Sequence, residues 1–192
     1  YGNWYEWLIG IQGGGFRKIH ISFIGDMGPV PATKFVTKFL EKYSPRILVN
    51  FGLSGTLSKD VKIGDVVVAT LTDLYDDAGS IEEINGVPCL KPSGRPIPVS
   101  FFKNQVENYK YRNALKHNAW QQLCYQSKKQ YLPINLPNDV KKYISDKVSI
   151  HSGHIACGSV VVKSKEWKNA LKNKDRKYLA VDMESAAIAF AA

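Results

Sequence analysis

Residues 47–70 read ILVNFGLSGTLSKDVKIGDVVVAT, two apolar runs separated by a polar stretch that contains glycines. The runs at residues 47–49 and 61–71 predict buried strands. At the carboxyl end of a parallel strand, glycines let backbone amides approach a ligand closely, and open α/β sheets bind their ligands at such ends. Residues 50–55 are therefore a candidate pocket wall. The alternative is a plain tight connection whose glycines serve the backbone conformation alone.

The segment before this stretch has the pattern of a strand followed by a helix. Residues 18–24 (KIHISFI) alternate like a strand, and residues 31–43 place Phe35, Val36 and Phe39 on one helical face. With the strand at residues 47–49, this predicts a βαβ unit whose strands are parallel and central in a helix-covered sheet.

The remaining patterns predict a single α/β domain over residues 1–192, because 192 residues that are 44% hydrophobic can bury one sizeable core. The further predicted elements are a hairpin turn at residues 13–15, a hairpin tip at residues 85–86, a helix over 106–126, strands at 146–155 and 160–162, a helix over 164–173, and a strand over 178–183 that continues into a helix over 184–192.

Composition excludes several classes of protein. No apolar run approaches the roughly 18 residues that a membrane span needs, and the first residues lack the pattern of a signal peptide, so a soluble, cytoplasmic protein is expected. The three cysteines are scattered, which predicts neither a disulfide framework nor a cysteine metal site. His151 and His154 point to opposite faces of an extended segment, so we expect no metal and no cofactor.

The formal net charge of +9 calls for an anionic partner. Residues 163–177 are densely basic, but their lysines alternate with Trp167, Ala170 and Leu171 at helical spacing. This spacing favours the solvated face of an amphipathic helix. Nucleic acid and a phosphorylated small substrate remain as alternatives.

A second strand end carries side chains suited to a sugar. In YLAVDMESAAIAF, Asp182, Met183 and Glu184 stand where the apolar strand gives way to a helix of small residues. A carboxylate there can accept two hydrogen bonds from a vicinal diol, and a methionine can cover the apolar face of the sugar. The alternative is that Glu184 only complements the positive end of the helix dipole.

Three motifs occur in order: NFGLSGTL with KIGDVVV, then GHIACGSVVV, then LAVDMESAAIA. Together they resemble the purine nucleoside phosphorylase/nucleosidase superfamily, in particular its methylthioadenosine/S-adenosylhomocysteine nucleosidase branch, from about residue 18 to residue 192. The resemblance implies a three-layer α/β/α sandwich around a mixed, partly barrel-like sheet. It also implies a purine nucleoside or nucleotide as substrate and a homodimer or homohexamer as assembly.

The same resemblance implies roles for individual residues. Glu184 would hold the ribose hydroxyls beside Asp182, and Met183 would pack on the sugar. Val161 and Val162 would contact the base, the second through its backbone. The residues that would line the pocket near the sugar are Gly28, Gly52, Leu53, Ser54 and Gly55.

The chain departs from the family pattern in ways that affect the chemistry. Phosphorylases place a hydroxyl residue after the first glycine of the loop, whereas Leu53 follows Gly52 here. This favours water over phosphate as the nucleophile. The family acid that orients water would lie before Tyr1, and the aspartate that protonates the purine would lie beyond Ala192. The catalytic residues therefore stay unassigned, and the chain is either part of a longer protein or a catalytically incomplete relative.

The leading hypothesis is thus that water cleaves the N-glycosidic bond of a purine, with adenine as the expected base. A phosphorylase, a nucleotide-sensing module and a basic nucleic-acid-binding domain are the alternatives. Residues 151–192 also resemble nucleosidase-like domains of larger bacterial proteins, some of which are anti-phage effectors that cleave adenine nucleotides. The basic composition suits a substrate with a 5′-phosphate.

Overall fold

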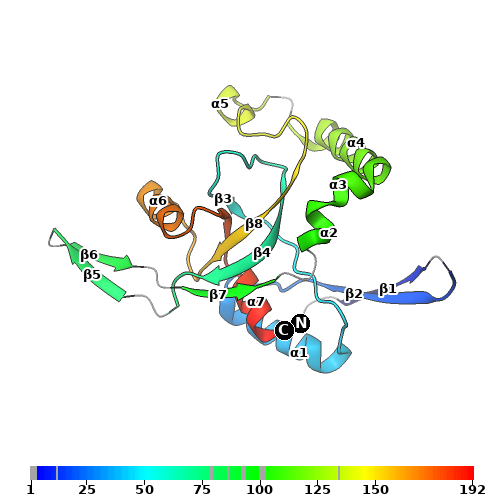
Figure 1. The fold of residues 1–192 in the computed structure, drawn as a ribbon, viewed down its shortest axis with the longest axis horizontal. Coiled ribbons are helices and arrows are strands. Elements are labelled where there is room, and N and C mark those ends of the chain that lie inside the picture. Colours follow the sequence, from blue (N-terminus) through cyan, green and yellow to red (C-terminus); the bar gives the residue numbers. More distant parts are fainter. Residues whose placement is uncertain are drawn as a thin grey trace.

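The computed structural model describes residues 4–11, 13–77, 80–85, 87–91, 94–99, 103–133 and 135–192. A five-stranded sheet forms the centre (Figure 1), with the order β3 (Gly55–Thr56), β9 (Tyr178–Asp182), β8 (Ile150–Cys157), β4 (Val66–Leu74) and β7 (Arg95–Pro98). The three middle strands are parallel, and both edge strands are antiparallel to their neighbours. The sheet is therefore mixed, as expected.

Helices cover both faces of this sheet. Asp73 of β4 binds Lys174 of α6 (Lys165–Lys174), at 2.6 Å between the carboxylate and Nζ. The next residue, Leu74, lines a cavity together with Ala186 of α7 (Ser185–Ala191). Because consecutive strand residues point to opposite faces, α6 and α7 lie on opposite sides of β4. The predicted α/β/α layering is confirmed.

Each helical layer has its own apolar cluster. On one side, α7 packs against α1 (Pro29–Tyr43) through the buried residues Ala32, Val36, Ala187 and Ile188. The other cluster joins α6 to the sheet through Leu57, Tyr75, Ala156, Leu171, Tyr178 and Val181. Figure 1 shows the α1–α7 pair below the sheet and α6 beside β9. The predicted helix over residues 31–43 is confirmed by α1.

The first two strands form a hairpin outside the central sheet. β1 (Trp4–Gly10) pairs with β2 (Phe16–Ser22) in antiparallel register. The predicted turn at residues 13–15 is confirmed, and its three glycines have φ values of 99°, 98° and 89°, which favour glycine. Trp4 stacks on Phe35 of α1 with 5.1 Å between ring centroids, which joins the hairpin to the body.

The predicted βαβ unit is wrong. β2 pairs with β1 and not with the central sheet, and residues 47–49 form no strand; Ile47 and Val49 are 47% and 74% exposed. A strand needs a neighbour for its backbone hydrogen bonds, and among the described residues no strand pairs with this segment. Apolar composition alone could not reveal that.

The helix predicted over residues 106–126 is broken into α2 (Lys103–Glu107), α3 (Tyr109–Arg112) and α4 (Ala114–Tyr131). The breaks fall at Asn108 and Asn113, and Asn113 has φ −130° and ψ 44°, outside the helical region. Asparagine side chains compete for backbone hydrogen bonds and so favour helix ends. Asn108 shows this competition, since its Nδ2 donates to the carbonyl of Asn104 at 2.8 Å.

The bounds of most other predicted elements agree with the structure to within a few residues. The hairpin is formed by β5 (Ser80–Ile84) and β6 (Val87–Lys91), with Asn85 at φ 53°; Gly86 lies outside the described residues. Residues 160–162 form no strand, and a short α5 (Asn138–Lys141) precedes β8. In the described part of the chain, no helix combines the length and apolar character that a membrane span requires.

Candidate functional site

The carboxylate of Glu184 reaches a residue 156 positions earlier in the chain. Its Oε1 accepts a hydrogen bond from the backbone N–H of Gly28 at 2.6 Å. Gly28 precedes the first turn of α1 with φ 105°, a conformation that glycine adopts without strain. The contact brings together two residues predicted from the sequence to share a site. Glu184 is half-buried at the carboxyl end of β9.

The carboxylate of Asp182 binds within its own strand–helix junction and not to α1. Its two carboxylate oxygens accept hydrogen bonds from Ser185, at 3.1 Å from the backbone nitrogen and 2.7 Å from the hydroxyl. Burial raises the pKa of Asp182, and the nearby negative charge of Glu184 adds to this rise, while the bonds from Ser185 oppose it. Asp182 therefore accepts the hydrogen bonds that the first residue of α7 donates. Glu184 makes no side-chain capping bond to that helix, and its carboxylate extends instead to α1.

Cys157 pairs with Asp182 across β8 and β9, and both Cys157 and Tyr75 are fully buried. Burial, with the charge of Asp182, raises the pKa of the Cys157 thiol to about 12. The thiol is therefore protonated near neutral pH and does not act as a nucleophile. Gly158 lies so close to Tyr75 that an added Cβ would meet the ring at 2.2 Å.

Residues 158–162 leave the sheet at the same edge as Glu184. The N–H of Gly158 donates to the Asp182 carbonyl at 3.1 Å, and Ser159 donates to Asp76 from its backbone and hydroxyl at 2.7 and 2.6 Å. Val161 is 59% exposed. The side chain of Val162 packs against the core cluster around Tyr75, which holds its backbone in place.

Sequence reasoning missed Asp76 and Ser159, which fix this segment. The signal that could have found them is the acidic pair at residues 76–77, a few residues after the strand predicted over 61–71, combined with the Gly158–Ser159 turn after the strand predicted over 146–155. Both stand at carboxyl strand ends, where sheets of this kind bind ligands.

The glycine loop approaches the same edge. Gly55 pairs with Val181, and a Cβ on Gly55 would lie 3.2 Å from the valine side chain. Leu53 is 99% exposed, and Gly52 and Ser54 are also exposed. Met183 is half-buried between the two strand-end acids. The structure thus places the loop beside β9, and among the described residues no hydrogen bond joins Ser54 to Glu184.

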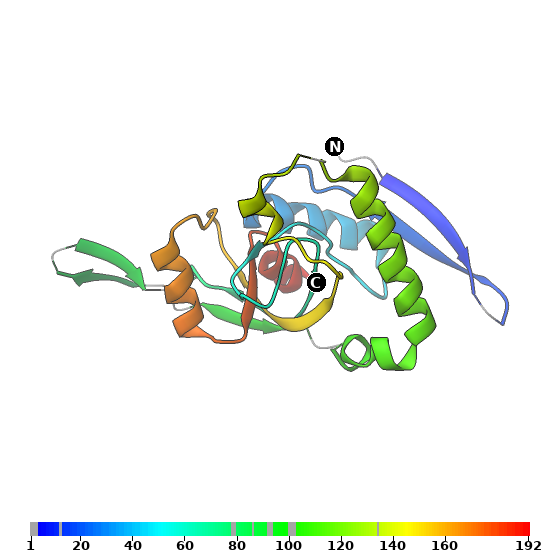
Figure 2. The same cartoon turned by 90° about the horizontal axis from the view of Figure 1, so that it is seen from above.

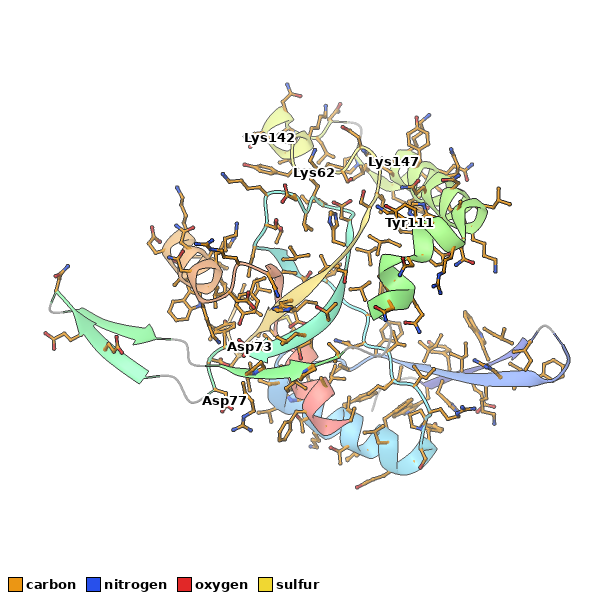
Figure 3. The ribbon with its side chains drawn as sticks, in the orientation of Figure 1. Lys62, Asp73, Asp77, Tyr111, Lys142 and Lys147 are labelled. Carbon is orange, nitrogen blue, oxygen red and sulfur yellow. The ribbon has the colours of Figure 1, made fainter. Side chains whose placement is uncertain are left out.

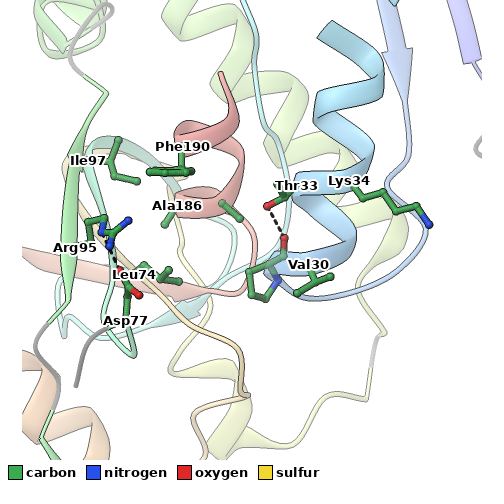
Figure 4. Close-up of a pocket in the computed structure, with 11 residues that line it drawn as sticks. Val30, Thr33, Lys34, Leu74, Asp77, Arg95, Ile97, Ala186 and Phe190 are labelled. Carbon is green, nitrogen blue, oxygen red and sulfur yellow. Dashed lines mark hydrogen bonds and ion pairs between the residues drawn. The ribbon is translucent and has the colours of Figure 1, made fainter. Parts of the chain in front are cut away.

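A cavity of about 470 Å³ lies next to the Glu184–Gly28 contact, between α1, α7 and β7 (Figure 4). Its lining includes Pro29 and Ala186, neighbours in sequence of the contact, as well as Phe190. Arg95 Nε and Asp77 form an ion pair at its edge, at 2.8 Å. None of the ten residues predicted from the sequence lines this cavity.

The two histidines considered as metal ligands are each bound to a different aspartate. His151 lies 3.1 Å from Asp65, and His154 lies 2.5 Å from Asp175. In the residues that the structure describes, no three histidine, cysteine or acidic side chains gather into a metal-binding group.

This arrangement can bind a polar ligand that has one apolar face. The Glu184 carboxylate offers acceptors for hydroxyl donors, and its Oε2 receives no hydrogen bond among the described residues. Val161 and Met183 offer apolar surface at the same edge. A carboxylate beside apolar side chains suits a diol joined to a flat, weakly polar ring.

Curated relatives carry the names of nucleoside-cleaving enzymes. A 5′-methylthioadenosine/S-adenosylhomocysteine nucleosidase of Maridesulfovibrio salexigens is 26% identical over 169 residues, 87% of this chain and 58% of the relative. The enzyme of that name from Buchnera aphidicola subsp. Schizaphis graminum is 25% identical over 182 residues, 94% of this chain and 63% of the relative. The chain thus spans less than two thirds of both relatives.

Solved structures share the fold. The 5′-methylthioadenosine/S-adenosylhomocysteine nucleosidase of Neisseria meningitidis, in complex with methylthio-immucillin-A, has a TM-score of 0.59 at 18% identity, over 97% of this chain and 69% of that one. Futalosine hydrolase of Helicobacter pylori also has a TM-score of 0.59, at 21% identity, over 97% and 70%. The family model for the phosphorylase superfamily matches residues 9–192, and the chain belongs to that superfamily.

Proposed function

We propose that the protein binds a purine nucleoside or nucleotide at Glu184 and cleaves its N-glycosidic bond with water. The observation that carries the proposal is the 2.6 Å bond between Glu184 and Gly28, which directs this carboxylate to the carboxyl edge of the sheet while Asp182 serves α7. Glu184 then holds the ribose diol, Met183 covers the sugar, and Val161 contacts the base.

The reaction breaks the bond between C1′ and the base nitrogen and forms a bond between C1′ and the water oxygen. The base leaves with a proton, and the water loses one. The sugar passes through an oxocarbenium-like state, so the site must hold the nucleophile below C1′ and help the base to leave. Among the described residues we assign the diol to Glu184 and leave base protonation unassigned. Residues 1–192 act as one domain in this proposal.

Two features support water over phosphate. Leu53, which has no hydroxyl, follows Gly52 in the loop. The relatives and structural neighbours named above are nucleosidases and a hydrolase. Adenine is the proposed base, because the relatives' names specify 5′-methylthioadenosine.

The net charge of +9 supports a substrate that carries a 5′-phosphate, as expected for a nucleotide-cleaving domain in anti-phage defence. We place this activity in the cytoplasm and in a homo-oligomer. The phosphate part of the proposal fails if adenosine and ATP are cleaved with equal efficiency.

A sensing module is the second candidate. It is favoured by one observation: the only described acid directly beside Glu184 in the strand end, Asp182, is committed to Ser185. A protein with Glu184 but no acid for the base would bind a nucleotide without cleaving it.

Chromatographic detection of free adenine tests the proposal. The protein is incubated with methylthioadenosine, adenosine and ATP, each with and without phosphate, and nucleotide binding is measured in parallel. Adenine released without phosphate is the expected result, whereas release only with phosphate identifies a phosphorylase. Binding without release, lost in Glu184→Ala, identifies the sensing module. If the protein neither binds a nucleotide nor releases adenine, both the proposed reaction and the sensing module are contradicted.

A further inference from the structure

A second charged region lies at the opposite end of the sheet from Glu184. Residues 109–148 contain eight lysines and arginines and only two acidic residues. This segment includes α3, α4 and α5 and ends where β8 begins. Because β4, β8 and β9 are parallel, the amino-terminal ends of β4 and β8 lie away from the Glu184 edge. We call the region formed by α4, residues 141–148 and residues 59–65 the α4 surface.

Hydrogen bonds make the α4 surface continuous. Ile63 donates to the Tyr143 carbonyl at 2.8 Å and accepts from Ser145 at 2.9 Å, which joins residues 59–65 to residues 141–148. Lys128 Nζ donates to the Ser145 carbonyl at 2.9 Å, and Gln121 donates to the Val148 carbonyl at 2.9 Å, which joins α4 to the same segment. Lys62, Lys142 and Lys147 consequently gather at one end of the molecule, as Figure 3 shows.

A cavity of about 420 Å³ separates α4 from residues 146–148. Three amide side chains, one tyrosine and two lysines contribute to its lining: Asn118, Gln121, Gln122, Tyr125, Lys128 and Lys147. Asp146 is the only acidic residue in the lining and is 99% exposed. Amides can pair with the edge of a base, a tyrosine ring can stack on its face, and lysines can bind phosphate.

Exposed aromatic and cationic groups surround this cavity. Tyr125 is 48% exposed with Lys129 Nζ 4.6 Å from its ring centroid, and Tyr143 is 58% exposed with Lys142 Nζ 5.0 Å from its ring. Helix α4 has 18 residues and none of them is buried. Figure 2 shows α4 on the side of the molecule away from α6. Some α4 side chains, among them Gln121 and Lys128, are half-buried, but most of the helix surface faces solvent and is open to a partner.

We propose that the α4 surface binds single-stranded nucleic acid, with bases in the cavity at Tyr125 and Gln122 and the backbone on Lys129, Lys142 and Lys147. An acidic protein would satisfy the lysines but would leave the amides and the tyrosine ring without matched partners. A duplex keeps its bases paired and stacked, so it would use the lysines alone. This binding is independent of the proposed reaction at Glu184.

Fluorescence anisotropy with labelled single-stranded RNA of about 15 nucleotides tests the proposal, since known single-strand sites span up to about that length. The triple variant Lys129→Gln/Lys142→Gln/Lys147→Gln should weaken binding about tenfold or more. It should also reduce the slope of log K against log salt by about 2, the value for three phosphate contacts. Tyr125→Leu should weaken binding about fivefold or more through lost stacking.

Matched variants separate local contacts from overall charge. Lys165→Gln/Lys168→Gln/Lys172→Gln on α6 removes the same charge, and Tyr5→Leu removes a tyrosine of similar exposure, 49%, from β1. Both should bind like the unchanged protein. The proposal is overturned if the α6 variant weakens binding equally, if the duplex binds as tightly as the single strand, or if polyglutamate of equal charge displaces the RNA as well as unlabelled RNA does.

Discussion

The side chains of Asp182 and Glu184 turn in different directions from the same strand end. Asp182 accepts two hydrogen bonds from Ser185, the first residue of α7, whereas Glu184 accepts a hydrogen bond from Gly28 at the start of α1. From the sequence, both acids were candidates for the ligand, and the helix dipole was the competing explanation for Glu184. The structure gives the capping role to Asp182, which leaves Glu184 for the ligand in our proposal.

Gly158 is required by packing. An alanine Cβ there would lie 2.2 Å from Tyr75 Cζ, so Gly158→Ala must move a fully buried ring. We expect the free energy of unfolding to fall by about 1 to 3 kcal/mol, the usual cost of overpacking. Urea denaturation measures it. Gly52→Ala is the matched control, because its added Cβ meets nothing within 4 Å, and equal midpoints for the two variants would contradict the packing account.

At the scale of elements, local patterns predicted α1, α6, α7 and β9 well, because each has a clear apolar face or run bounded by capping residues or turns. Residues 47–49 were predicted wrongly because strand formation depends on a partner that lies far away in sequence. The breaks in the long helix fall at Asn108 and Asn113. The side-chain bond of Asn108 to the Asn104 carbonyl and the non-helical backbone of Asn113 are invisible in an apolar pattern.

The start of α7 depends on an acceptor and not on a charge. Asp182→Asn keeps an oxygen for Ser185 and removes a carboxylate whose pKa burial raises, so stability near neutral pH should be retained or increased. Asp182→Ala removes both bonds and should cost about 1 kcal/mol of unfolding free energy. Thermal unfolding of the two variants decides this. Equal losses in Asn and Ala variants would show that the charge is what matters.

Asp65, which joins residues 62–65 to Ser149 just before β8, should make the stability of the protein depend on pH in the acid range. Burial raises the pKa of this carboxyl, but hydrogen bonds from the backbone of Lys62 and Ser149, together with Ser145 and His151, outweigh burial and lower it below 3.8. A lowered folded-state pKa gives stability that is present above pH 3.8 and is lost as pH falls through the folded value.

Urea midpoints measured downward from about pH 5 test this dependence. The unchanged protein should lose stability below pH 3.8 more steeply than Asp65→Asn, which has no carboxyl to protonate at this position. Asp60→Asn, at an exposed position nearby, is the control and should follow the unchanged protein. A profile for Asp65→Asn as steep as that of the unchanged protein would assign the acid sensitivity elsewhere.

In the whole molecule, the sheet separates two surfaces of different chemistry. The carboxyl edge carries the Glu184–Gly28 contact, and the opposite end carries the lysines of the α4 surface. The sequence motifs predicted that Glu184 and Gly28 lie near one another, and the 2.6 Å hydrogen bond joins them. The motifs could not show that Asp182 is committed to Ser185, that Asp76 holds residues 158–162, or that the cavity of about 470 Å³ lies beside the predicted residues without including them.

The measurement that most directly tests the central claim is calorimetric binding of adenosine and of 2′,3′-dideoxyadenosine to the unchanged protein and to Glu184→Ala, with Glu166→Gln as the control for charge. If Glu184 holds the sugar diol, adenosine should bind the unchanged protein about 10- to 100-fold more tightly than its dideoxy analogue, as charged hydrogen bonds typically provide. That difference should vanish in Glu184→Ala and persist in Glu166→Gln. A preference for adenosine that survives in Glu184→Ala would contradict the claim.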